Sequence, residues 1–311
     1  MMNIHYFSAS DEDRRFAAAL LGDGGFTQVY ADPQSAADMR DATRAILQSK
    51  AYAVDAPDVV VTSLQIAGVP CERIATSDAD ASGLIVFLHG GGFVRGSLEL
   101  GRQSAIELAV LSRRPVLAIG FRQAPEHRFP AASLDVLHVY RTLLAQGHAS
   151  EAIVFVGESA GGCLALTLPA RVVRGECPLP AGMAGLCPMA DLQMHGASWY
   201  VNASRDIATR EMGKRMLDLY IDDADRSDPL AAPLNTPYDA NANVLLCVGA
   251  NEVMLSDVER FADHAERAGA CVALNLYETM PHGFTKFDTP LARKAMRHTA
   301  DWCVDRLADA R

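Results

Sequence analysis

The chain has 311 residues, half of them apolar, which is enough to bury a large core within a single α/β domain. It carries 28 basic and 38 acidic residues, a formal net charge of −10, and no run of five or more basic residues. We therefore expect neither nucleic acid nor an anionic membrane as a partner, because both require clustered Lys and Arg. The N-terminus lacks a signal-peptide pattern and no apolar stretch is long enough to span a membrane, so a soluble cytoplasmic protein is expected.

Seven cysteines are dispersed along the chain without a CxxC pair. They are Cys71, Cys163, Cys177, Cys187, Cys247, Cys271 and Cys303. Their odd number and apolar surroundings favour buried free thiols over a disulfide framework or a metal site.

Residues 1–50 show helical spacing in two segments, the first with Phe16 and Leu20 and the second with Met39 and Ile46. Two short helices ahead of the sheet are predicted, as part of a cap or as a plain N-terminal brace.

From residue 59 the pattern becomes one of strands. A β-hairpin is predicted at 59–66 and 69–75, joined at Ala67-Gly68. Strands then alternate with helices, which implies parallel strands with covering helices and about eight strands in all. The later strands are expected at 84–88, 116–119, 153–156, 183–187, 244–248 and 272–277. The helices are expected at 100–112, 133–145, 163–173, 255–268 and 291–307.

A long connection, residues 191–242, separates the sixth and seventh predicted strands and contains Trp199, Tyr200 and a helical stretch at 212–220. Connections of this length inside a compact domain are typical of a lid or a substrate-binding element, the alternative being simple packing on the sheet edge. The predicted organisation is N-terminal cap helices at 1–50 and a catalytic domain at 51–311 that contains this insertion.

Residues 153–162, IVFVGESAGG, run from an apolar strand through Gly-x-Ser-x-Gly into an apolar helix. In such a nucleophile elbow the Ser has strained dihedral angles, and Gly157 and Gly161 allow strand and helix to approach closely. The hydroxyl of Ser159 is then exposed beside a helix N-terminus, where an oxyanion is stabilised. Ser159 is the predicted nucleophile.

His89-Gly90-Gly91-Gly92-Phe93 follows the predicted strand 84–88 directly. Backbone N–H groups of Gly91 and Gly92, with that of Ala160, are predicted to form an oxyanion hole. A phosphate-binding loop is disfavoured because no Lys-Ser/Thr pair follows the glycines. His89 is interpreted as an anchor of this loop rather than as a catalytic base.

A Ser nucleophile needs a base, and the base needs an orienting carboxylate. Of nine histidines, His282 is the best candidate for the base because it lies in a loop after the last strand. The other candidates are read as structural: His127 in a turn, and His138, His264 and His298 within helices.

Glu252 follows strand 244–248 and is the predicted triad acid. Asp257 is the alternative, although at a helix start it also serves the helix dipole. Asp228, in Asp-Pro-Leu, has no strand directly before it and is read as structural.

The order Ser159, Glu252, His282 is that of α/β-hydrolases. With HGGGF at 89–93, FRQAPEHRFPAA at 121–132, GESAGG at 157–162 and PHGF at 281–284, the chain resembles the bacterial hormone-sensitive-lipase-like esterases over residues 60–305. The resemblance implies an α/β-hydrolase fold with a mostly parallel eight-stranded sheet, a helical cap built from the N-terminal helices and the 191–242 insertion, a covalent acyl-enzyme and no cofactor. Family members usually have Asp or Thr where this chain has Glu158, Leu where it has Gln123, and Asp as the acid.

The expected function is that of a serine carboxylesterase acting on short- to medium-chain acyl esters. A lactone hydrolase or an amidase would use the same triad. A non-catalytic binding protein on this fold is the alternative from another class, but such proteins tend to lose the Ser, the His or the glycines, which are all present here. The partner is a small-molecule ester or lactone, with homodimer formation left open.

Overall fold

The computed structural model describes residues 2–22, 35–50 and 54–308 of the chain. Within them one nine-stranded sheet runs in the order β1-β9-β8-β7-β6-β4-β5-β3-β2. The strands are β1 (Asn3–Phe7), β2 (Val59–Ile66), β3 (Val69–Thr76), β4 (Leu84–Leu88), β5 (Val116–Ile119), β6 (Ile153–Glu158), β7 (Gly182–Leu186), β8 (Asn243–Gly249) and β9 (Cys271–Tyr277). The α-helices are α1 (Asp11–Gly22), α3 (Ala36–Lys50), α4 (Leu98–Ser112), α5 (Ala131–Ala145), α6 (Ala160–Leu166), α7 (Leu168–Val173), α8 (Ser198–Val201), α9 (Arg210–Tyr220), α10 (Leu255–Arg267) and α11 (Pro290–Ala308).

The sheet is parallel from β1 to β5 in this spatial order, and β2 and β3 close it as an antiparallel hairpin. The predicted hairpin is confirmed, with Ala67 and Gly68 both at positive φ, as a two-residue hairpin turn requires. The predicted βαβ alternation is confirmed as well.

The prediction of eight strands is wrong by one, because β1 was not foreseen. Its side chains Ile4 and Tyr6 are more than half exposed, so the segment shows no buried apolar face. What makes it a strand is parallel pairing with β9, some 270 residues away. The two predicted N-terminal helices are confirmed as α1 and α3.

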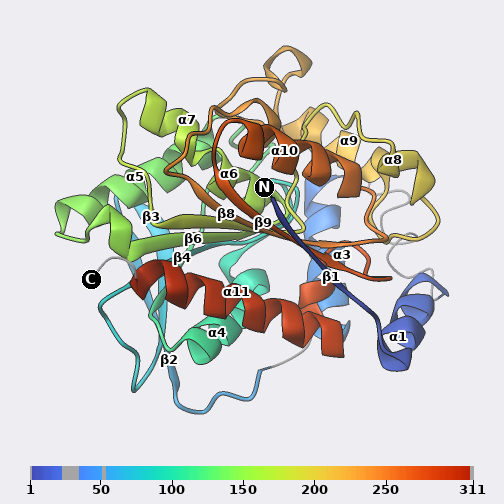
Figure 1. Cartoon of the computed structure of the whole chain (residues 1–311), viewed down its shortest axis with the longest axis horizontal. Coiled ribbons are helices and arrows are strands. Elements are labelled where there is room, and N and C mark those ends of the chain that lie inside the picture. Colours follow the sequence, from blue (N-terminus) through green and yellow to red (C-terminus); the bar gives the residue numbers. More distant parts are fainter. Residues whose placement is uncertain (1, 23–34, 51–53, 309–311) are drawn as a thin grey trace.

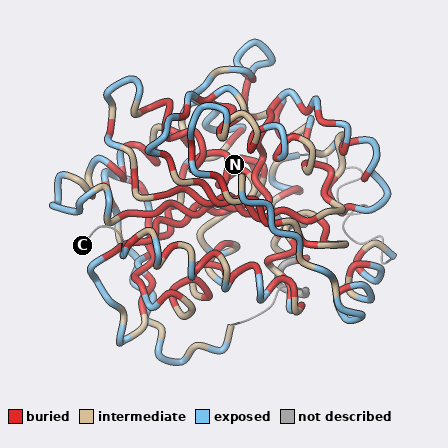
Figure 2. Tube along the Cα trace, viewed as in Figure 1, coloured by how far each residue is buried: buried red, intermediate tan, exposed pale blue. Residues whose placement is uncertain are grey.

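Helices cover both faces of the sheet (Figure 1), and the sheet forms the buried centre of the molecule (Figure 2). Alternate residues of each strand face opposite layers. In β4, Ile85 and Phe87 pack in the core under α4 and α11, whereas Val86 and Leu88 pack in the core under α5, α6 and α10. This double burial explains why the central strands are almost wholly apolar.

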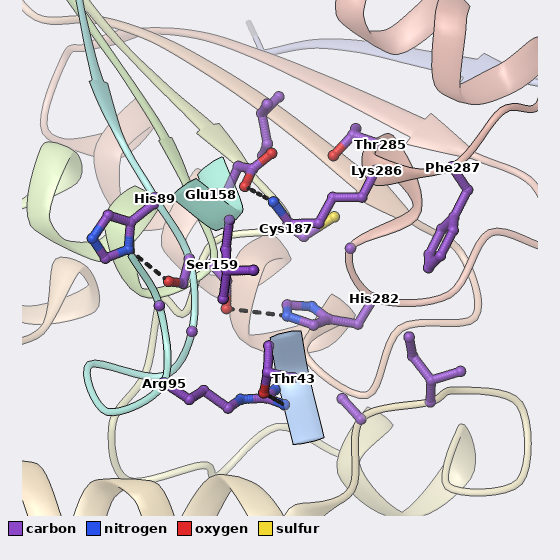
Figure 3. A pocket seen from close by; sticks show the side chains of 18 of the residues that line it. Thr43, His89, Arg95, Glu158, Ser159, Cys187, His282, Thr285, Lys286 and Phe287 are labelled. Atoms are coloured by element: carbon purple, nitrogen blue, oxygen red, sulfur yellow. Dashed lines mark hydrogen bonds and ion pairs between the residues drawn. The ribbon is translucent and has the colours of Figure 1, made fainter. Parts of the chain in front are cut away.

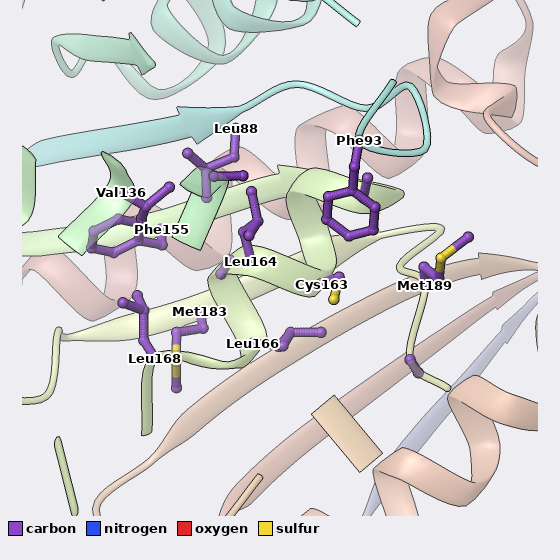
Figure 4. Close-up of a cluster of buried hydrophobic side chains, with 14 of the residues drawn as sticks. Leu88, Phe93, Val136, Phe155, Cys163, Leu164, Leu166, Leu168, Met183 and Met189 are labelled. Atoms are coloured by element: carbon purple, nitrogen blue, oxygen red, sulfur yellow. The ribbon is translucent and has the colours of Figure 1, made fainter. Parts of the chain in front are cut away.

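The helix predicted at 163–173 is in fact two helices, α6 and α7, separated at Thr167. Pro169 in the first turn of α7 has no N–H to donate, so the α6 ladder cannot continue through it. Leu164 of α6 packs with Leu88, Phe155 and Val136 in one apolar cluster (Figure 4). This packing fixes the N-terminus of α6 at the end of β6.

All seven cysteines are free thiols, as predicted. Six are buried, but Cys271 is exposed because it opens β9 at the end of the sheet. Among the described residues, no helix combines the length and the apolar character needed to cross a bilayer.

Candidate active site

Ser159 lies between β6 and α6 with φ 50° and ψ −112°, the strained conformation expected of a nucleophile elbow. The flanking glycines are required by close backbone contacts. A Cβ on Gly157 would lie 2.2 Å from the backbone of Gly161, and a Cβ on Gly161 would lie 2.1 Å from the carbonyl oxygen of Leu88. The predicted reason for small residues at these two positions is confirmed.

The structure brings together the three residues predicted to form the triad (Figure 3 shows Ser159 and His282). The Oγ of Ser159 lies 3.1 Å from Nε2 of His282, and Nδ1 of His282 lies 3.0 Å from Oε2 of Glu252. His282 follows β9 and Glu252 follows β8, so both side chains come from loops at the carboxyl ends of adjacent parallel strands. With Nδ1–H donating to Glu252, Nε2 is free to accept the hydroxyl proton of Ser159.

Glu252 is completely buried, and its second oxygen, Oε1, accepts a hydrogen bond of 2.6 Å from the N–H of Gly249. The carboxylate is therefore held at both oxygens. Burial lowers the pKa of His282, but the hydrogen bond to Glu252 and the negative charges of Glu252 and Asp206 outweigh burial and the opposing charge of Arg95, so the net shift is upward. Such an imidazole is a stronger base and a more stable imidazolium.

The thiol of Cys187 lies beside the same pair, and its sulfur falls within 4.8 Å of the ligand atoms of Glu252 and His282. Burial and the neighbouring Glu252 raise its pKa well above the ordinary value, so it remains a protonated donor toward that carboxylate. Thiolate is the form that binds metal ions and attacks substrates, so this setting disfavours both roles for Cys187.

The two alternative acids contact other groups. Asp257 is buried in the first turn of α10, where Oδ2 accepts from Nε1 of Trp199 (2.6 Å) and Oδ1 from Arg260 (3.1 Å). Its role is thus to tie the insertion to α10, rather than only to complement the helix dipole. Oδ1 of Asp228 caps its own turn by accepting from the N–H of Leu230 (2.7 Å), in agreement with the structural reading.

The glycine-rich loop after β4 runs along one wall of the cavity. Gly91, with φ +115°, lines the cavity. Gly92, with φ +60°, is not a lining residue and packs against Met216, whose sulfur would lie 2.3 Å from an added Cβ. Ala160 is buried at the start of α6, next to Ser159. Gly91 is thus required by its positive φ and by space, since an added Cβ would lie 2.3 Å from the backbone N of Gly96, whereas Gly92 is favoured by its positive φ.

His89 anchors this loop, as predicted. It is buried, its Nδ1–H donates to the carbonyl of Gly90 (2.9 Å), and its ring stacks on Phe121 at 4.2 Å. Burial lowers its pKa to about 4, so the ring is neutral at physiological pH. His89 therefore holds the loop and is not placed to act as the base of Ser159.

Two further side chains that hold the loop were not foreseen from the sequence. The amide of Gln123 bonds Gly96 twice, accepting from its N–H (2.8 Å) and donating to its carbonyl (2.7 Å). Arg40 of α3 donates to the carbonyls of Val94 (2.7 Å) and Ala124 (2.9 Å). Every residue type offers the same backbone carbonyl, so the sequence does not show which backbone groups Gln123 and Arg40 will bond.

The cavity at Ser159 is bounded partly by the segments predicted as cap. Thr43 of α3 lines it, as do Ile207, Ala208 and Met212 of the 191–242 insertion. Trp199 and Tyr200 do not line it: Trp199 is buried against Asp257, and Tyr200 is 67% exposed.

Two ionic side chains, Lys286 and Glu158, form an ion pair in the cavity wall (Figure 3). Ser104 donates a hydrogen bond to Glu158 (2.6 Å). This pair joins the segment after His282 to the residue before Ser159. Asp206 in the insertion is buried and contacts the backbone of His282 (2.7 Å), a contact that no sequence pattern predicted.

Ser159 has strained dihedral angles and is hydrogen-bonded to His282, which is hydrogen-bonded to Glu252, at the carboxyl edge of a mostly parallel sheet. This arrangement defines an α/β-hydrolase. Comparisons with known proteins agree. A family described as the alpha/beta hydrolase fold matches residues 85–286. An esterase of Acinetobacter venetianus is 32% identical over 252 residues, 80% of this chain and 83% of that protein. An ethyl acetate hydrolase of Pseudomonas putida is 30% identical over 219 residues, 66% of this chain and 67% of that protein.

Among solved structures, an esterase from the bacterial hormone-sensitive lipase family matches with a TM-score of 0.87 and 29% identity, covering 97% of this chain and all of that chain. The chain belongs to the α/β-hydrolase family. The resemblance to hormone-sensitive-lipase-like esterases drawn from the sequence is confirmed.

Proposed function

We propose that this carboxylic ester hydrolase is a serine carboxylesterase that cleaves short- to medium-chain acyl esters through Ser159, His282 and Glu252. The observation that carries the proposal is the unbroken hydrogen-bonded line from Ser159 Oγ to His282 (3.1 Å) and on to Glu252 (3.0 Å), beside a cavity. Each member has the residue type and partner that its role requires.

In the acylation step, Ser159 Oγ bonds to the ester carbonyl carbon while His282 Nε2 takes the hydroxyl proton. Negative charge moves to the carbonyl oxygen, which accepts hydrogen bonds from the N–H groups of Gly91, Gly92 and Ala160. Each such donor is worth about 3 kcal/mol in the transition state. The tetrahedral species then expels the alkoxide, which leaves as the alcohol with the proton from His282.

In deacylation the same groups act on water. His282 takes a proton from a water molecule as its oxygen bonds to the acyl carbon, and returns that proton to Ser159 Oγ as the acid departs. Throughout, Glu252 accepts from Nδ1 and stabilises the imidazolium. No cofactor or metal enters this scheme.

The size of the acyl group is inferred from the cavity wall. Its apolar lining includes Leu100, Leu186, Ile207, Ala208, Met212 and Phe287. Three of these residues, Ile207, Ala208 and Met212, come from the 191–242 insertion, which supports its role as a cap together with the N-terminal helices. One relative, the Pseudomonas putida protein, is named for ethyl acetate, a small ester, and this supports a preference for short acyl groups.

Initial rates on p-nitrophenyl acetate, butyrate, octanoate and palmitate, with a lactone and an anilide in the same panel, test this function. We expect kcat/KM to be highest for acetate or butyrate and to fall toward palmitate. A preference for the lactone or the anilide over every ester would refute the proposed substrate class but leave the triad intact.

Met212→Ala tests the cap, because Met212 belongs to the insertion, lines the cavity and is not a member of the triad. We expect this variant to raise the octanoate-to-acetate ratio of kcat/KM. Tyr200→Ala is the matched control from the same insertion, since Tyr200 is 67% exposed and does not line the cavity. Equal ratios in both variants would contradict the assignment of the insertion to the cap.

A further inference from the structure

One buried carboxylate in the insertion, that of Asp206, joins the loop of the acid to the loop of the base. Its side chain is 2% exposed. Oδ2 accepts from the N–H of Val253 at 2.7 Å, and Oδ1 accepts from the N–H of His282 at 2.7 Å. Oδ1 also accepts from the N–H of Ile207 at 2.7 Å, which fixes the orientation of the carboxylate. Val253 directly follows Glu252, so Asp206 holds the acid loop next to Glu252 and the base loop at His282 itself.

A second residue of the insertion, Asn202, binds the same loop, and it bonds the peptide group between Glu252 and Val253 at its carbonyl oxygen. Nδ2 of Asn202 donates to the carbonyl oxygen of Glu252 at 2.9 Å and to that of Ala250 at 3.3 Å. The carbonyl of Glu252 is thus held by Asn202 and the peptide N–H that follows it by Asp206. The acid loop is clamped to the insertion by its backbone and not only by packing.

We propose that Asp206 is a positioning residue for ester hydrolysis, whose negative charge and two-loop clamp align Glu252 with His282 and favour the imidazolium. This inference rests on the proposed triad. Because Asp206 belongs to the insertion, the alignment of the triad also depends on how the insertion packs against the catalytic domain.

The chemistry of the contacts calls for a carboxylate. The hydrogen-bond partners of the Asp206 carboxylate are backbone N–H donors, so both of its oxygens must accept. An amide at this position has only one acceptor oxygen. Its NH2 group would face the N–H of either Val253 or His282, and two donors cannot form a hydrogen bond.

The charge of Asp206 acts on His282 in the same direction as that of Glu252. The charged groups that act on His282 are Glu252 and Asp206, which raise its pKa, and Arg95, which lowers it, while the Cys187 thiol nearby stays neutral. Burial and the charge of Glu252 raise the pKa of Asp206 itself to about 6, against the lowering effect of His282 and of the N–H donors, so the carboxylate is ionised at neutral pH.

Asp257 supplies a matched control. It is equally buried, at 1% exposed, and it also links the insertion to the catalytic domain, through Trp199 (2.6 Å). Its carboxylate bonds Trp199 and Arg260, and neither contact involves Glu252 or His282. A purely structural role predicts that Asp206→Asn and Asp257→Asn behave alike.

The test compares kcat, KM, the pH profile of kcat/KM and the thermal midpoint of wild type, Asp206→Asn, Asp257→Asn and Ser159→Ala. We expect Asp206→Asn to lower kcat on the order of 10- to 100-fold with little change in KM, as a displaced catalytic group does. The acid limb of its profile should move to lower pH, because a negative charge that favours imidazolium has been removed. Asp257→Asn should lose thermal stability yet keep the kcat and the pH midpoint of the wild type.

Two results would overturn the inference: a kcat and pH midpoint of Asp206→Asn equal to those of Asp257→Asn, or fast hydrogen exchange at the amides of Val253 and His282 in the wild-type protein. The exchange measurement needs no variant, so it decides the matter even if Asp206→Asn does not fold. Slow exchange at both amides, comparable to that of β8 and β9, supports the clamp. Retained turnover in Ser159→Ala would instead refute the proposed triad, whatever Asp206 does.

Discussion

Replacement of Glu252 by Gln tests the acid with almost no change in shape. The buried carboxylate accepts from Gly249 at 2.6 Å and from His282 at 3.0 Å, so both oxygens are committed as acceptors. A Gln keeps only one acceptor. If its oxygen serves Gly249, its NH2 group faces Nδ1–H, and the imidazole must change to the tautomer with hydrogen on Nε2, which cannot take the proton of Ser159.

We expect Glu252→Gln to lower kcat for p-nitrophenyl acetate by about 10³- to 10⁴-fold, the effect of the wrong His tautomer in a Ser-His-Asp triad. This loss corresponds to about 4 to 5.5 kcal/mol of transition-state stabilisation. Steady-state rates, burst-phase acylation and the thermal midpoint should be measured together. The midpoint should change little, because the replaced side chain has the same volume.

Asp257→Asn and Asp228→Asn are the controls, since both carboxylates bond groups other than His282. Both should retain turnover. The reasoning fails if Glu252→Gln remains within tenfold of the wild type, or if one of the two controls is the inactive variant.

Three more predictions follow from the site and its surroundings. The kcat/KM should fall with decreasing pH with a midpoint above 6.5, the ordinary His value, because the net pKa shift of His282 is upward and only the neutral ring accepts the proton; a midpoint below 6.5 contradicts this. Gly161→Ala should cost at least about 1 to 3 kcal/mol of stability in a urea titration, since its Cβ would meet the Leu88 carbonyl at 2.1 Å, whereas Gly22→Ala, with nothing within 4 Å, should be neutral. Burial and the charge of Glu158 raise the pKa of Glu107 from 4.5 to about 7, so the folded state binds more protons than the unfolded state between these values and loses stability as pH rises. When melting is measured at a pH above 7, Glu107→Gln should therefore have a higher thermal midpoint than the wild type. Near pH 4.5 the two thermal midpoints should be the same.

The parts of the molecule that the sequence predicts well are those with local causes. Ser159 and its glycines lie within five residues of one another, and their spacing alone prescribes a strand, a strained turn and a helix. Continuous apolar runs predict the central strands, because both faces of the sheet are covered by helices. His282 and Glu252 could be placed because strand ends point to a common edge.

The features that could not be predicted from the sequence depend on contacts between segments that are far apart in the chain. β1 has exposed side chains and is a strand only because β9 lies beside it. Asp206 reads as one more acid in a polar loop, and its role comes from backbone N–H groups 47 and 76 residues further along the chain. Backbone donors have no residue code, so only the folded structure reveals such a clamp.

The central claim is that Ser159 attacks the ester and carries the acyl group. Intact-protein and peptide mass spectrometry after treatment with an organophosphonate ester tests it most directly, since that reagent forms a stable bond to an activated Ser. We predict a single adduct on the peptide containing Ser159, formed at a much lower rate in His282→Ala and absent from Ser159→Ala, which should also have lost ester hydrolysis. An adduct on another residue, or undiminished hydrolysis by Ser159→Ala, would contradict the account.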